Sequence, residues 1–108
     1  MIYFYSLTDK ASVTSFKLSE ETGNTPPYTV NENDTRTFQC HVDSNPASQI
    51  TIRKQDGSML VDNNNVKNVS YVKTLGCLDA GNYLCSGNNL HNGNDKSSMD
   101  LGLFVRCK

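Results

Sequence analysis

Four cysteines and two histidines are the residues of this chain best suited to redox chemistry or to a zinc site. The cysteines are Cys40, Cys77, Cys85 and Cys107. They are separated by 37, 8 and 22 residues, whereas zinc ligands come in close pairs. His41 adjoins Cys40 and His91 lies in a predicted loop, so neither histidine stands at ligand spacing from its neighbours. We therefore expect no metal and no other cofactor. We expect two disulfides instead, for which four cysteines allow three pairings.

Two disulfides indicate an oxidising compartment, because thiols are kept reduced in the cytosol. Two sequons, Asn33-Asp34-Thr35 and Asn68-Val69-Ser70, agree with this. We expect glycans on Asn33 and Asn68. The sequence thus predicts an extracellular protein, either secreted or the ectodomain of a membrane-anchored one.

The remaining polar residues show no catalytic arrangement. Ser97 and Ser98 lie near His91 in the sequence, but no Gly-x-Ser-x-Gly elbow surrounds a serine. The disulfides would use every cysteine, which leaves no thiolate nucleophile. Asp34 and Asp79 are expected to hold local turns rather than calcium. We therefore predict that the chain is not an enzyme.

Length and charge narrow the class further. A chain of 108 residues suits one domain. The ten Lys/Arg are balanced by eleven Asp/Glu, so we expect no nucleic-acid partner. The sequence also has no polybasic segment that could bind an anionic membrane surface. No apolar run approaches the roughly 20 residues that span a bilayer, so we expect no direct membrane insertion. Met1–Leu7 is apolar but lacks the features of a signal peptide. We expect residues 1–11 to be an amino-terminal extension and residues 12–108 to form the domain.

Short β-rich runs alternate with breaks rich in Asn, Asp, Gly, Pro and Ser, which is typical of an all-β sandwich. The predicted strands are Ser12–Leu18, Thr29–Val30, Arg36–Val42, Gln49–Lys54, Met59–Val61, Val69–Leu75, Asn82–Ser86 and Met99–Cys107. The predicted turns are residues 43–46, 55–58, 62–65 and 87–95. The residues expected to face the core are Phe38, Cys40 and Val42 in one strand and Leu101, Leu103 and Val105 in the last.

The stretch Asp79-Ala80-Gly81-Asn82-Tyr83-Leu84-Cys85 places a tyrosine two residues before a cysteine, just after a glycine turn. It resembles the tyrosine corner of immunoglobulin-like sandwiches, in which the phenol hydrogen-bonds back to the backbone. Upstream, Val30-Asn31-Glu32-Asn33-Asp34 resembles the family's approach to its second strand, with Asn33 in a turn of positive φ. From Ser12 to Lys108 the chain resembles I-set-like domains of the immunoglobulin superfamily, such as those of invertebrate multi-domain recognition proteins at the cell surface or secreted.

The resemblance implies an immunoglobulin-like Greek-key sandwich of two antiparallel sheets, pinned by a disulfide between Cys40 and Cys85. Asp79, Gly81 and Tyr83 would form the corner, and Ile52 would stand where the family has its core tryptophan. If the last two strands form a hairpin centred near residue 92, paired residues have numbers that sum to about 184. Cys77 and Cys107 satisfy this sum, so we expect a second disulfide between them.

Such a sandwich offers its end loops and the face of its C–F–G sheet to partners. The expected contacts are Asn89, Leu90 and His91 in the loop 87–95 and Arg53 and Lys54 on the predicted strand Gln49–Lys54. Glycans on the two sequons would crowd the opposite A–B–E side. The resemblance therefore implies an extracellular recognition or adhesion module that binds a protein or cell-surface partner, homophilic or heterophilic.

Two other functions remain open from the sequence. The domain could be a structural spacer, which ligand binding sensitive to Leu90 and His91 would contradict. It could also be a carbohydrate-binding innate-defence module. Support for sugar stacking is thin, because the aromatic residues outside the cores of the predicted strands are Tyr3, Phe4, Tyr5 and Tyr28.

Overall fold

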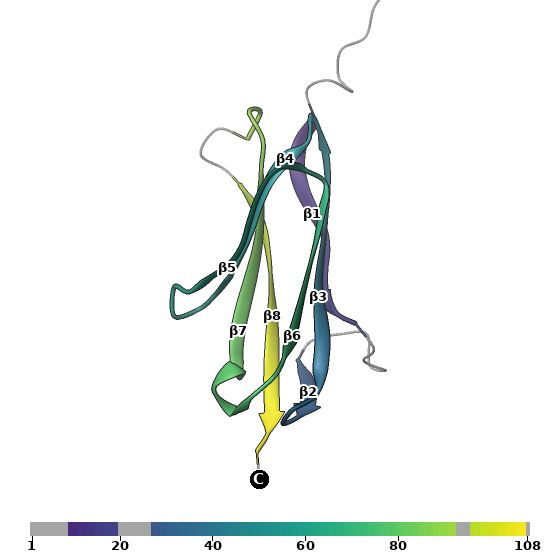
Figure 1. Cartoon of the computed structure of the whole chain (residues 1–108). Coiled ribbons are helices and arrows are strands. Elements are labelled where there is room, and N and C mark those ends of the chain that lie inside the picture. The colour runs from purple at the N-terminus through teal and green to yellow at the C-terminus, as the bar shows by residue number, and fades with distance from the viewer. Residues whose placement is uncertain (1–8, 20–26, 93–95, 108) are drawn as a thin grey trace, which may run out of the picture.

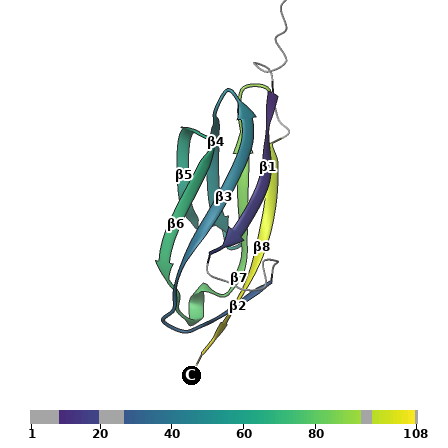
Figure 2. The same cartoon turned by 90° about the vertical axis from the view of Figure 1, so that its right-hand side faces the viewer.

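The structure, a computed structural model, describes residues 9–19, 27–92 and 96–107. The described residues form the strands β1 (Asp9–Leu18), β2 (Tyr28–Asn31), β3 (Thr35–Asn45), β4 (Ser48–Lys54), β5 (Met59–Val66), β6 (Asn68–Thr74), β7 (Gly81–Asn88) and β8 (Ser97–Arg106), with the 3-10 turn η2 (Cys77–Asp79). One sheet has three strands in the order β1-β3-β6, and the other has five in the order β2-β8-β7-β4-β5. The sheets face each other in an elongated sandwich (Figures 1 and 2). The predicted all-β class is confirmed.

The five-stranded sheet is mixed rather than antiparallel. β2 runs parallel to β8, from Tyr28 beside Leu103 to Asn31 beside Arg106, whereas β1 pairs antiparallel with β3 in the other sheet. The parallel pairing buries Tyr28 and also covers an edge of β8 that would otherwise be unpaired. The prediction of two antiparallel sheets is therefore wrong for β2.

The hairpin of β7 and β8 has the predicted register. Tyr83 lies beside Leu101 and Cys85 beside Met99, so the residue numbers of each pair sum to 184. The period-two pattern of β8 is confirmed as well, because Leu101 and Leu103 are buried and Val105 packs against the core.

Most strands are longer than the sequence pattern indicates, and the differences at β1, β3 and β5 have clear causes. β1 begins at Asp9, so part of the expected extension lies in a strand, with Ala11 in the core. β3 continues to Asn45 by pairing with β1. β5 continues through residues 62–65, which were expected to turn. Because β5 is an exposed edge strand, its backbone pairs with β4 although its sequence does not alternate apolar and polar residues. Asn65 takes a φ of 62° at the point where the register of this pairing shifts.

A close approach between the two sheets requires a glycine at position 87. A Cβ added to Gly87 would lie 2.9 and 3.0 Å from the two γ-methyl carbons of Val42 on β3. We expect Gly87→Ala to lower the free energy of unfolding by about 1–3 kcal/mol, the usual cost of overpacking. In a Val42→Ala background the same change should cost clearly less, because the clashing methyls are gone. Urea unfolding of the four proteins measures this coupling, and equal costs in both backgrounds would contradict the clash.

Candidate recognition surface

Two disulfides fix the frame that carries the surface. Cys40 on β3 and Cys85 on β7 join the two sheets in the core, with a Cα–Cα distance of 6.5 Å. Ile52 on β4 lies beside Cys85 and is fully buried, in the place where the resemblance put it. Cys77 and Cys107, both exposed, form the second disulfide with a Cα–Cα distance of 5.6 Å. This second bridge ties η2 to the end of β8.

The bend between β6 and β7 is held by the tyrosine corner. The Tyr83 hydroxyl donates to the carbonyl of Asp79, four residues earlier. The Asp79 carboxylate accepts from the N–H of Gly76 at 2.7 Å and lies 3.7 Å from the Lys73 ammonium. Gly81 has a φ of 140°, which a side chain rarely adopts. These contacts give Tyr83, Asp79 and Gly81 the structural roles expected for them.

Lys54 belongs to the same bend. Its ammonium donates to the carbonyl of Leu78 and lies 6.0 Å from the centre of the Tyr83 ring. Its ammonium thus satisfies a turn carbonyl at this end of the sandwich, while Lys54 also lines the hollow that Arg53 lines. That Lys54 contacts a partner stays a prediction.

Tyr83 makes this corner sensitive to high pH. Burial of the phenol, followed by the charge of Asp79, raises the pKa of Tyr83 from 10.0 to about 12. Because the folded pKa is the higher one, the stabilisation is complete below pH 10 and is lost as the pH rises towards 12. We expect Tyr83→Phe to remove this part of the pH dependence and to cost about 1 kcal/mol at neutral pH. Urea unfolding of both proteins between pH 8 and 11 tests this expectation, because the titration of lysines affects both proteins equally. Parallel curves of unfolding free energy against pH would contradict a contribution from Tyr83.

The turn between β7 and β8 is clamped by two buried asparagines. The Oδ1 of Asn92 accepts from the N–H of Ala11 on β1 at 2.9 Å and from that of Asn89 at 3.0 Å. Its Nδ2 donates to the carbonyl of Ala11 at 3.2 Å. The Nδ2 of Asn89 donates to the carbonyl of Pro46, between β3 and β4, at 3.0 Å. Residues 89–92 are thus fixed to β1 and to the segment between β3 and β4.

The clamp decides which residues of this turn face solvent. Leu90 is 76% exposed and stands between the two asparagines. His91 is half-buried, and its N–H donates to the Oδ1 of Asn89 at 3.0 Å. Asn89, which we expected to contact a partner, is 9% exposed and holds the turn instead. Among the described residues of this turn, Leu90 is therefore the exposed apolar one.

The outer face of the five-stranded sheet carries a row of three residues on adjacent strands. Arg53 on β4 lies beside Leu84 on β7, and Leu84 lies beside Asp100 on β8. The three side chains line one hollow of about 370 Å³. Phe104, 59% exposed, lies further along β8 on the same face. This face, made by β4, β7 and β8, is the C–F–G face of the sequence prediction, and Arg53 lies on it as expected.

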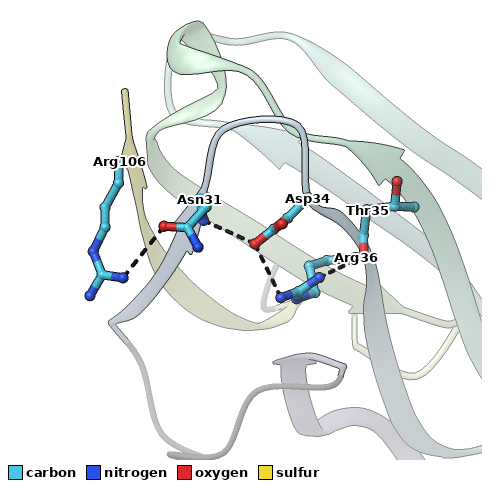
Figure 3. A network of polar contacts seen from close by, with 5 residues as sticks. All are labelled: Asn31, Asp34, Thr35, Arg36 and Arg106. Carbon is cyan, nitrogen blue, oxygen red and sulfur yellow. Dashed lines mark hydrogen bonds and ion pairs between the residues drawn. The ribbon is translucent and has the colours of Figure 1, made fainter. Parts of the chain in front are cut away.

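The turn between β2 and β3, which carries the first sequon, is fixed by the polar network in Figure 3. The Asp34 carboxylate accepts from the N–H of Asn31 at 3.0 Å and pairs with Arg36 at 3.3 Å. Arg106 donates to the Oδ1 of Asn31 at 3.4 Å. Asn33 is exposed with a φ of 75°, so the predicted positive φ is confirmed.

The second sequon lies on the outer face of the three-stranded sheet. Asn68 opens β6 beside His41 of β3, and its side chain is exposed, while Val69 points into the core. Asn33 stands at the end of the sandwich, between the sheets. Both asparagines are thus accessible, and neither lies on the face formed by β4, β7 and β8.

Sequence reasoning missed Leu84, Asp100 and Asn92. The position of Leu84 and Asp100 on the outer face becomes evident only when β7 is placed between β4 and β8.

Within residues 9–19, 27–92 and 96–107, no three His, Cys, Asp or Glu side chains lie close enough together to form a metal site. The same ranges contain no helix long and apolar enough to cross a membrane.

Comparison with known proteins agrees with this architecture. A family model described as an immunoglobulin domain matches residues 18–103. The first immunoglobulin domain of mouse SynCAM 2 is 18% identical with a TM-score of 0.61, over 74% of this chain and 90% of that one. Sidekick-1 immunoglobulin domains 1–5 are 17% identical with a TM-score of 0.67, over 93% of this chain and 20% of that one. Titin Z1Z2 in complex with telethonin is 13% identical with a TM-score of 0.68, over 92% of this chain and 48% of that one.

No curated protein matches the chain significantly. The three structures share its fold, and the matched family model covers most of the sequence. Immunoglobulin domains are generally non-enzymatic, and those with disulfides are typical of extracellular or cell-surface proteins. The chain belongs to the immunoglobulin domain family.

Proposed function

We propose that this domain is an extracellular recognition module that binds a protein partner through the Leu90 tip and the outer face of β4, β7 and β8. The observation that carries the proposal is the exposure of Leu90 on a turn clamped by Asn89 and Asn92. An apolar side chain held in place before binding costs little ordering entropy when it enters a partner's pocket. The described residues therefore present a preorganised anchor.

Three further facts support the proposal. Immunoglobulin domains of similar fold are found in complexes with other proteins, as in titin Z1Z2 with telethonin. The sequons at Asn33 and Asn68 lie away from the proposed surface, so glycans there would leave it open. Two disulfides favour an oxidising, extracellular setting.

The test uses tetramers of the purified domain added to cells of the parent organism. We expect Leu90→Asp to reduce cell binding about tenfold or more, because burying an unpaired carboxylate in an apolar pocket is costly. Leu78→Asp is the matched control, since Leu78 is 90% exposed on η2 at the other end of the sandwich. Equal binding by both variants would contradict a role for the tip. Absence of any binding by the wild-type tetramer would favour a spacer.

A further inference from the structure

The outer face of β4, β7 and β8 carries opposite charges on either side of an apolar residue. Arg53 and Asp100 flank Leu84 in one row, two strand spacings or about 9–10 Å apart. Neither charge forms an ion pair with another described residue. Both are thus available to an opposite charge on a second surface.

We propose that this face binds a second copy of the same chain, as a two-fold symmetric dimer centred on Leu84. The inference rests on the proposed function, because it names the partner of the same surface. In an interface with two-fold symmetry, each copy uses the same patch. The patch must therefore be complementary to itself.

The row of three residues has this self-complementarity for one orientation of the axis. A two-fold axis that lies in the interface and runs along β7 exchanges the β4 side with the β8 side. It places Arg53 of each copy opposite Asp100 of the other, and Leu84 opposite Leu84. An in-plane axis perpendicular to the strands would place like charges together, which is repulsive. The charges therefore select the first orientation.

Apolar shape adds to the charge argument. Phe104 projects from β8, while the hollow of about 370 Å³ lies mainly over β4, the turn after it and β7, with Gln55 and Gly57 on its β4 side and Asp100 at its β8 edge. The same rotation carries Phe104 of one copy to the β4 side of the other, where this hollow lies. An exposed aromatic ring and a hollow on exchanged sides of one face fit a symmetric contact.

The central row of the other sheet lacks this pattern. On its outer face Lys17, Gln39 and Ser70 lie side by side, with a single charge in that row. Asn68 opens a strand of the same sheet. A charged row without an opposite sign cannot match itself under a two-fold rotation.

Sedimentation velocity of the purified glycosylated domain, over a wide concentration range, tests the dimer. We expect a monomer–dimer equilibrium, weakened about tenfold or more by Arg53→Asp and by Asp100→Arg, because each single change creates two like-charge contacts. The double variant Arg53→Asp with Asp100→Arg should restore the wild-type dissociation constant to within about threefold. Lys17→Asp is the control on the other sheet and should change nothing. A wild-type monomer at every concentration, or a double variant no better than the singles, would overturn the proposal.

A cysteine at the symmetry axis gives a second, independent readout. Leu84→Cys should form a disulfide-linked dimer on mild oxidation, because the axis brings the two copies of this position together. Val72→Cys, 64% exposed on β6, should not. Crosslinking of both variants to the same extent would also overturn the proposal. If the domain is monomeric but its tetramers still bind cells in a Leu90-dependent way, self-association fails and the proposed function stands.

Discussion

Replacing Cys40 and Cys85 together by alanine is expected to lower the free energy of unfolding by at least about 4 kcal/mol. The bridge closes a loop of 45 residues, for which chain entropy alone gives about 4 kcal/mol. Loss of two buried sulfur atoms from the centre of the core adds to this. A small domain has about 5–15 kcal/mol in total, so the variant should be close to unfolded at 37 °C. Urea unfolding followed by circular dichroism measures the loss.

The matched control removes the second bridge. Cys77 and Cys107 close a loop of 30 residues, but both are exposed. Their replacement by alanine should cost less than that of Cys40 and Cys85, because no core contacts are lost with them. A larger loss from the exposed pair would contradict the view that the buried bridge is the main covalent support of the sandwich.

Phe38→Ala is expected to be the most damaging single change, at about 3–5 kcal/mol. The Phe38 ring is fully buried, and its centroid lies 4.8 Å from that of Tyr83, 6.2 Å from that of Tyr71 and 6.4 Å from that of Phe16. Truncation would leave a cavity where the two sheets meet at the tyrosine corner.

Phe104→Ala provides the comparison, because Phe104 is exposed and should change stability by less than about 0.5 kcal/mol. Thermal and urea unfolding of the two variants measure the difference. Similar losses from both would mean that Phe38 is not at the centre of the core.

The disulfides, the register of β7 and β8 and the tyrosine corner could be predicted from sequence. Each depends on residues close together in the sequence or on the position of one hairpin centre. A hairpin centre fixes every pair of β7 and β8, so the sum of 184 placed Cys77 near Cys107. The corner at Tyr83 and the positive φ at Asn33 depend on residues within a few positions. Such features do not require knowledge of the rest of the fold.

The tip and the outer face could not be predicted in the same way. Asn92 bonds to Ala11, 81 positions away, and Asn89 bonds to Pro46, 43 positions away. In the sequence these asparagines look like any other turn residue, although they are buried supports. Likewise, the polar run 62–65 looks like a turn because an edge strand needs no buried side chains.

A glycan placed on the outer face of β4, β7 and β8 tests most directly whether this face recognises a partner. Leu84→Asn completes a sequon with Ser86, and Val72→Asn completes one with Thr74 on the opposite sheet. After expression through a secretory pathway, we predict that the glycan on β7 abolishes cell binding by tetramers and that the glycan on β6 does not. Leu84→Gln, which adds no sequon, separates the effect of the glycan from that of the lost leucine and should reduce binding clearly less than the glycan does. Undiminished binding with a confirmed glycan at position 84 would contradict the account.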